Sequence, residues 1–328
     1  MSIFLSRFKK LIFLVYLSSS CSFFSFAMAQ GVYPMRPITI IVPAPPGGNL
    51  DIVARIYGAA LAKALNQTVV IENKAGASTN IGTGFVARST PDGYTLLFAG
   101  AELTVNEYLY KLPFNPRTAL IPITLAVETP IYLIVRKDLA VNSVAELIAM
   151  AKASPGKLTY SSAGVGSPPN LSAELFKSTT STSILHVPYQ GAAQGLLDVI
   201  AGRIDVMFPS KPLGQQYVIS GKIKLLASTS EHRLASEPNL PSIAETVPGF
   251  NVRSWAGLVV PEGTPKSIID TLVNASQTVL NEKSVANKLQ ELGLEVINGN
   301  AQDASVLLTT ERAKWAEMVK RGQMKASE

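Results

Sequence analysis

ITIIVPAPPGGNLDIVAR, residues 38–55, sets the fold of this chain. The residues at 38–42 are all β-branched and do not alternate with strongly polar ones, which predicts a strand buried on both faces of a parallel sheet. A run of prolines then stops further strand pairing, and Gly47 and Gly48 permit a tight turn. The stretch therefore predicts a buried strand that ends in a short, stiff loop.

A helix is expected directly after this loop. Asn49 belongs to a residue type favoured at helix caps, and apolar residues recur after it with helical spacing: Ile52, Val53, Ile56 and Tyr57. Because the helix begins where the strand ends, its unpaired N–H groups lie at the carboxyl edge of the sheet. Ligands bind at that edge in open α/β sheets, and a helix start favours an anion such as a carboxylate. The alternative is a turn that only connects the strand to the helix.

Residues 1–29 have the features of a secretory signal peptide. Three basic residues precede a short apolar run at 11–17, and Ala27-Met28-Ala29 matches a small-x-small cleavage site. We expect cleavage after Ala29, which yields an exported protein that begins at Gln30. A retained membrane anchor and a lipid attached to Cys21 are the alternatives.

Composition narrows the classes of partner. The 328 residues include 29 Lys and Arg against 23 Asp and Glu. The three basic residues of the signal peptide reduce 29 to 26 in the exported protein, and this small excess gives no reason to expect nucleic acid. The single cysteine, Cys21, is removed by cleavage, so we expect neither disulfides nor thiolate metal sites. We predict no metal and no cofactor.

From residue 38 onward, short apolar runs alternate with helical periods, the pattern of an α/β protein. Four further loops lead from an apolar run toward a helix: 75–80, 99–102, 162–168 and 188–191. Their Ser, Thr and Asn residues also suit helix capping, which is the purely structural interpretation. Five loops of one kind, with a long return segment at 228–254, predict two α/β lobes that face each other across a cleft.

We therefore divide the chain into four segments. Residues 1–29 form the signal peptide and 30–128 the first part of lobe 1. Residues 129–252 form lobe 2, and 253–328 return to lobe 1 and add the C-terminal helices. The predicted ligand site is the cleft between the lobes.

Several short motifs together resemble one family. They are Pro45-Pro46-Gly47-Gly48, Asn80-Ile81-Gly82, Pro91-Asp92-Gly93-Tyr94, Gly164-Val165-Gly166-Ser167 and Val187-Pro188-Tyr189-Gln190-Gly191. With them the chain, from about Tyr33 to its end, resembles the Bug family, the TctC-like periplasmic solute receptors of tripartite tricarboxylate transporters. The resemblance implies a type II-like Venus flytrap of two lobes. Such a receptor captures a small carboxylate in the cleft and delivers it to membrane permease subunits.

The residues expected to contact the ligand come mainly from the five loops. In lobe 1 they are Pro46, Gly47, Gly48, Asp51, Ser78, Thr79, Asn80, Ala101 and Glu102. In lobe 2 they are Ser162, Ala163, Gly164, Gly166, Ser167, Tyr189, Gln190, Gly191 and Asp205. We expect N–H groups at the helix starts to hold the carboxylate, in a monomer whose lobes close on binding.

The sequence contains few residues suited to catalysis. Its two histidines are His186, in a predicted strand, where we expect a structural role, and His232, in a polar segment expected at the surface. No hydrolase elbow, zinc-binding helix or complete phosphate-binding loop follows a predicted strand. We therefore expect no enzyme. The alternatives are a sensor that reports its ligand to a membrane kinase, and an exported hydrolase or lyase using Asp51 and Glu102.

Three residues bear on the choice of ligand. Asp51 has three possible roles. As an acid in the first helical turn it can interact favourably with the helix dipole. It can also hold the loops in register, or accept a hydrogen bond from a water on the ligand. Glu102 stands where the resemblance leads us to expect a small or hydroxyl residue. If it faces the cleft, it repels a second carboxylate, which favours a monocarboxylate or a ligand with an amino or neutral polar group at its far end. Asn170 stands where many relatives have histidine, which leaves ligand choice open there.

Overall fold

The computed structural model describes residues 33–322 and Met324. The chain divides into Met1–Met35 and Arg36–Glu328, and every helix and strand named below belongs to the second unit. The predicted signal peptide, 1–29, lies outside the described residues. Within the described part, no helix combines the length and the apolar character that a membrane span requires.

The first sheet has six strands in the order β11-β4-β10-β3-β1-β2. Their bounds are Ile38–Val42 for β1, Val69–Asn73 for β2, Thr95–Gly100 for β3, Leu120–Thr129 for β4, Ser254–Pro261 for β10 and Glu295–Gly299 for β11. β1 runs parallel to β2 and β3, whereas β10 is antiparallel to β3 and β4. Four of the five residues of β1 are buried, so the strand predicted at 38–42 is confirmed.

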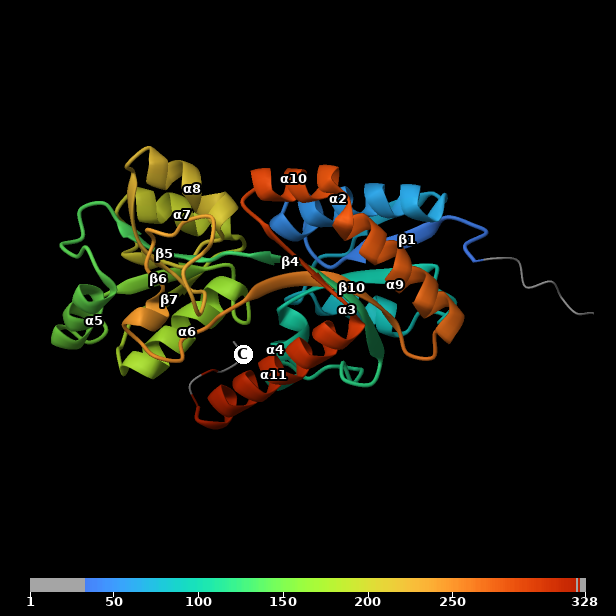
Figure 1. Ribbon diagram of the computed structural model, residues 1–328. Helices are drawn as coiled ribbons and strands as arrows, with labels where there is room; N and C mark the ends of the chain where they lie inside the picture. The colour runs from blue at the N-terminus through green and yellow to red at the C-terminus, as the bar shows by residue number, and fades with distance from the viewer. Residues whose placement is uncertain (1–32, 323, 325–328) are drawn as a thin grey trace, which may run out of the picture. The chain divides into compact units, whose positions relative to one another are not determined.

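Helices cover both faces of this sheet (Figure 1). One group consists of α2 (Asn49–Leu65), α9 (Lys266–Asn281) and α10 (Lys283–Glu291). The other consists of α3 (Asn80–Ala87), α4 (Glu102–Leu109) and α11 (Ala301–Lys320). The predicted buried face of α2 is correct for Val53 and Tyr57 but wrong for Ile52, which is 39% exposed. Small residues on α2 such as Ala54 and Gly58 contribute to the buried face instead, because they allow close packing.

The second sheet has five strands in the order β7-β6-β8-β5-β9. Their bounds are Tyr132–Arg136 for β5, Thr159–Ser162 for β6, Leu185–Pro188 for β7, Val206–Met207 for β8 and Ile223–Ser228 for β9. β6 is parallel to β7 and β8, so the loops after β6 and β7 leave the same edge. Helices α5 (Val144–Ala153) and α6 (Pro168–Thr180) lie on one face, and α7 (Ala192–Ile200) and α8 (Lys211–Ile219) on the other (Figure 1).

The chain passes between the two sheets twice, after β4 and again after β9, where a 3₁₀ turn at Ile243–Glu245 precedes β10. One hydrophobic cluster joins the two regions. Leu109 of α4 and Trp315 of α11 belong to the same buried cluster as Phe176 and Phe250. Trp315 is fully buried, so its large apolar side chain stabilises this junction.

Candidate ligand-binding site

One buried carboxylate holds the β1–α2 loop. Asp51, 2% exposed, accepts bonds at Oδ2 from the Gly47 N–H at 2.8 Å and from Arg55 Nε at 2.9 Å. At Oδ1 it accepts a bond from Asn73 Nδ2 at 2.8 Å, and the same amide donates to the carbonyl of Ala44 at 3.0 Å. Burial raises the pKa of Asp51, but the bonds from Arg55, Gly47 and Asn73 outweigh it, and the pKa lies below its usual value. Asp51 therefore holds the loop in register, as one of the alternatives predicted.

The first turn of α2 presents unpaired N–H groups. Gly48, rather than Asn49, is the cap, and it has no side chain to accept a bond. The side chain of Asn49 donates instead to Thr129 Oγ1 at 3.0 Å. Among the described residues, the main-chain N–H groups of 49, 50 and 51 have no acceptor. This helix start can therefore bind an anion.

The β2–α3 loop has an unusual backbone. Ala77, Ser78 and Thr79 have φ angles of 47°, 50° and 74°, in the left-handed region that residues with a Cβ rarely adopt. Thr79 stands at the cap position of α3 but makes no side-chain capping bond, so the alternative interpretation of this loop as a side-chain cap does not hold. Strained backbone of this kind persists only where surrounding contacts hold it.

Those contacts come from α4 and from the second sheet. Asn106 Nδ2 donates to the carbonyl of Ser78 at 2.6 Å and to Asn80 Oδ1 at 2.9 Å. The hydroxyls of Ser78 and Tyr110 lie 2.9 Å apart, and both donate to the carbonyl of Val165, at 3.4 Å and 3.2 Å. Val165 belongs to the β6–α6 loop. Two of the predicted loops, one from each sheet, therefore meet here.

The β6–α6 loop is held by side chains of its own region. Ser162 Oγ accepts a bond from the N–H of Gly164 at 3.1 Å, and Ser167 Oγ donates to the carbonyl of Gly164 at 2.6 Å. Gly166 donates its N–H to Asn170 Oδ1 at 3.0 Å. Asn170 is 2% exposed, so it supports the loop from beneath. Ser167 precedes a proline at the first turn of α6, and its hydroxyl does not cap the helix.

His186 supports the same loop. Its ring stacks on Tyr160 at 4.7 Å between centroids, and its Nε2 lies 2.6 Å from Ser162 Oγ. Burial lowers the pKa of His186, Glu174 raises it less and Lys177 lowers it further. The predicted structural role is confirmed by these contacts, and His232 is exposed as expected.

The β7–α7 loop lies beside it. Tyr189 donates its N–H to the carbonyl of Ser162 at 3.0 Å and its hydroxyl to Asp198 at 2.6 Å. Burial and the Asp198 carboxylate raise the pKa of Tyr189 to about 12, so its hydroxyl stays protonated. Gly191 is the cap of α7 and offers no side chain, while Gln190 is exposed. Among the described residues, no acceptor takes the N–H groups of 192, 193 and 194 in the first turn of α7.

Four more of the predicted residues have different surroundings. Pro46 is exposed beside Gly47, and Ala163 is half-buried beside Gly164. Ala101 is buried in the core behind its loop. Glu102 is the first residue of α4 rather than part of a loop, and burial raises its pKa although its own N–H opposes the rise.

Asp205 lies apart from the other predicted residues. Its carboxylate accepts bonds from Arg136 Nε at 2.8 Å and from the Thr159 N–H at 2.8 Å. Thr159 begins β6, whereas the ligand loops follow the end of that strand. Asp205 therefore ties strands together at the opposite edge, and we leave it out of the site.

Sequence reasoning missed Asn73, Asn106 and Tyr110. Asn106 and Tyr110 are one helical turn apart, so the sequence indicates that they share a helix face. It does not indicate which residues they contact. Asn73 ends the second strand, at the same edge of the sheet as the first loop. Its place directly after an apolar run could have indicated this position. Among the described residues no cluster of His, Cys, Asp and Glu suits a metal ion.

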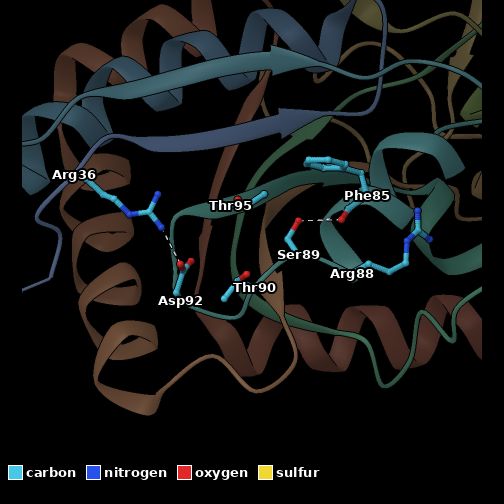
Figure 2. A pocket seen from close by; sticks show the side chains of 7 residues that line it. All are labelled: Arg36, Phe85, Arg88, Ser89, Thr90, Asp92 and Thr95. Carbon is cyan, nitrogen blue, oxygen red and sulfur yellow. Dashed lines mark hydrogen bonds and ion pairs between the residues drawn. The ribbon is translucent and has the colours of Figure 1, made fainter.

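A surface cavity of about 430 Å³ lies elsewhere on the first sheet's half of the molecule (Figure 2). It is lined by Arg36, Phe85, Arg88, Ser89, Thr90, Asp92 and Thr95. Thr95 begins β3, so this cavity is at the edge opposite to the loops. Arg36 Nη2 lies 2.8 Å from Asp92 Oδ2 in this cavity, and the ion pair neutralises the charge of Arg36.

Comparison with known proteins is consistent with this arrangement. Residues 53–324 match the model of the tripartite tricarboxylate transporter family receptor. The chain is 32% identical over 92% of its length to a protein of Pseudomonas sp. strain P51 from the tcbD-tcbE intergenic region, covering 91% of that protein. It is 32% identical to the BugT protein of Bordetella pertussis over 89% of its length and 91% of the relative.

Solved structures share the fold. R. palustris Rpa4515 with adipate is 34% identical with a TM-score of 0.82, over 90% of this chain and 100% of that one. The periplasmic binding protein BugD is 34% identical with a TM-score of 0.79 over the same shares. MatC from Rhodopseudomonas palustris with bound malate is 29% identical with a TM-score of 0.78, over 88% and 100%. The fold is thus that of a two-lobed periplasmic binding protein, and this chain belongs to the tripartite tricarboxylate transporter family of receptors.

Proposed function

We propose that this protein is a periplasmic receptor that binds a small carboxylate between its two lobes and delivers it to the permease subunits of a tripartite tricarboxylate transporter. Lobe 1 comprises residues 30–128 and 253–328, and lobe 2 comprises 129–252. The protein acts as a monomer without catalysis and without a cofactor. It is exported by a signal peptide that is cleaved after Ala29.

One observation carries the proposal. The β1–α2 loop is fixed by Asp51, yet the N–H groups at 49, 50 and 51 are left without a protein acceptor among the described residues. Fixed donors at the positive end of a helix suit a carboxylate, since no reorganisation is needed on binding. Relatives whose structures contain adipate and malate support the same ligand class.

The second lobe contributes donors of the same kind. Gly191 leaves the start of α7 uncapped by any side chain, and the β6–α6 loop beside it is held by Ser162 and Asn170. The contact between Ser78 and Val165 brings loops of the two lobes together. A ligand held by both lobes would couple its binding to their relative position.

A thermal-shift and calorimetry screen of the mature protein tests the proposal. The panel contains mono-, di- and tricarboxylates, with the corresponding alcohols and amides as uncharged controls. At a hundred times its Kd, a bound carboxylate is expected to add about 2.7 kcal/mol to the free energy of unfolding. If uncharged controls bind as well as the acids, or if no acid binds, the proposal is wrong.

A further inference from the structure

Glu102 is a carboxylate without a cationic partner beside the proposed ligand loops. Among the described residues, no hydrogen bond or ion pair to another side chain satisfies it, and no charged neighbour alters its pKa. Its side chain is half-buried, so it has lost part of its hydration while remaining accessible. A carboxylate in that situation is costly unless a partner compensates it.

The position of the carboxylate is set by a glycine. A Cβ placed on Gly100 would lie 2.9 Å from Glu102 Oε2, and 3.9 Å from Leu50 Cδ1. Gly100 ends β3, and Leu50 lies in the first turn of α2. Glu102 therefore folds back over the end of β3 toward the helix start that presents the free N–H groups. Any larger residue at 100 would displace the carboxylate from this place.

Two other acids near this edge already have partners. Asp51 is bonded to Gly47, Arg55 and Asn73. Glu128, near the end of β4, pairs with Arg253. Glu102 differs from both because none of the other described residues forms a hydrogen bond or ion pair with its side chain. Repulsion from its charge acts on any anionic group placed nearby, and attraction on any cationic one.

We propose that Glu102 selects a ligand that carries a cationic group, such as an ammonium, in addition to the carboxylate held by the helix starts. This inference rests on the proposed function and names its substrate class. The ligand is a zwitterion: its carboxylate meets the N–H groups at the start of α2, and its ammonium meets Glu102. A dicarboxylate of the same length places its second negative charge against Glu102 and is rejected.

Two matched series of acids test this. Valerate, δ-aminovalerate and glutarate have similar length and differ in the group at the far end, as do butyrate, γ-aminobutyrate and succinate. In calorimetry on the wild type, the amino acid of a series is expected to bind at least about tenfold more tightly than the other members. Glu102→Gln should abolish that preference and improve binding of the dicarboxylate, whereas Glu102→Asp should keep its direction.

Glu262→Gln is the control. Glu262 is exposed just after β10, at the end far from Gly100, so this variant makes the same change in net charge away from the site. It should retain the preference of the wild type. Circular-dichroism melts of all variants verify that each is folded.

Three results contradict the inference. Equal preference in the wild type and Glu102→Gln shows that Glu102 does not contact the ligand. Tighter binding of glutarate than of δ-aminovalerate by the wild type at neutral pH shows that a protonated Glu102 donates to a second carboxylate instead. Binding of carboxylates with no dependence on the far group overturns the inference alone, whereas failure of every carboxylate to bind contradicts the proposed function itself.

Discussion

The hydroxyl of Tyr110 donates to the carbonyl oxygen of Val165 at 3.2 Å. Tyr110 directly follows α4, which packs with the helices of the first sheet, and Val165 lies in the loop after β6 of the second sheet. Ser78 reaches the same carbonyl and the same hydroxyl. A contact between the two halves of the protein thus depends on one carbonyl and two hydroxyls.

Tyr110→Phe removes one donor to Val165 and retains the ring. We expect a loss of about 0.5–1.5 kcal/mol in the free energy of ligand binding, because the loops of the two lobes are less firmly tied. Calorimetry with the tightest carboxylate of the screen measures it. Tyr217→Phe on α8, outside the proposed site, is the matched control, and an equal effect in both variants would argue against a role for the contact.

Asp51→Ala should destabilise the protein and weaken binding. It leaves the donors of Gly47, Asn73 and Arg55 without their acceptor, at an expected cost of roughly 2–4 kcal/mol in the free energy of unfolding. The folded pKa of Asp51 is lowered, so its contribution is present above its unfolded pKa of about 3.9 and is lost as the pH falls below that value.

Urea unfolding at neutral pH and near pH 3 measures this difference. The gap between wild type and Asp51→Ala should shrink at the acidic pH. Asp270→Ala removes an exposed carboxylate paired with Lys266 and should cost no more than about 0.5 kcal/mol. If the difference in unfolding free energy between wild type and Asp51→Ala grew at the acidic pH, the predicted direction of the pH dependence would be wrong.

Gly48→Val should impair binding while the protein stays folded. Gly48 has φ of −72°, which other residues adopt, so the backbone itself is not strained by a side chain. A Cβ would lie 3.3 Å from the Pro45 carbonyl and would crowd the start of α2. We expect at least about tenfold weaker binding, with a loss of less than about 1.5 kcal/mol in stability.

Gly47→Ala provides the contrast. Gly47 has φ of +76° and no atom within 4 Å of a built Cβ, so its substitution strains the backbone without filling occupied space. It should cost about 1 kcal/mol of stability and affect binding less than Gly48→Val. Equal affinity in Gly48→Val and the wild type would place the ligand elsewhere.

His186 should make stability depend on pH. Its folded pKa is lowered, mainly by burial, so the unfolded chain takes up the proton more readily. The protein should therefore lose stability as the pH falls below about 6.5, the unfolded pKa of histidine. Urea unfolding between about pH 7.5 and 5.5 measures the loss, which His186→Gln should remove and His232→Gln should retain.

The exported protein should begin at Gln30. The site Ala27-Met28-Ala29 lies outside the described residues and is predicted from the sequence alone. Intact mass of protein recovered from the periplasm determines the first residue. A lipid on Cys21, detected as a mass increase on a longer chain, would contradict the prediction.

Local physical chemistry made part of the fold and site predictable. The β-branched run at 38–42 predicts β1, because such side chains suit a buried strand. Ser167 before Pro168 predicts the start of α6, since proline lacks the N–H that the first turn does not need. The capping role of Asn49 was mispredicted because Thr129, distant in sequence, offers its side chain a partner.

The sequence by itself determined the alternation of strands and helices and the loops that leave the sheets. Only the tertiary structure decided which of the loop residues act together. Asp51 is tied to Asn73 across 22 positions, and Tyr110 to Val165 across 55. Asp205 belongs to the opposite edge because Arg136 and Thr159 bind it there. Propensities and caps depend on neighbours in sequence, whereas a hydrogen bond depends on where the folded sheets bring its two atoms.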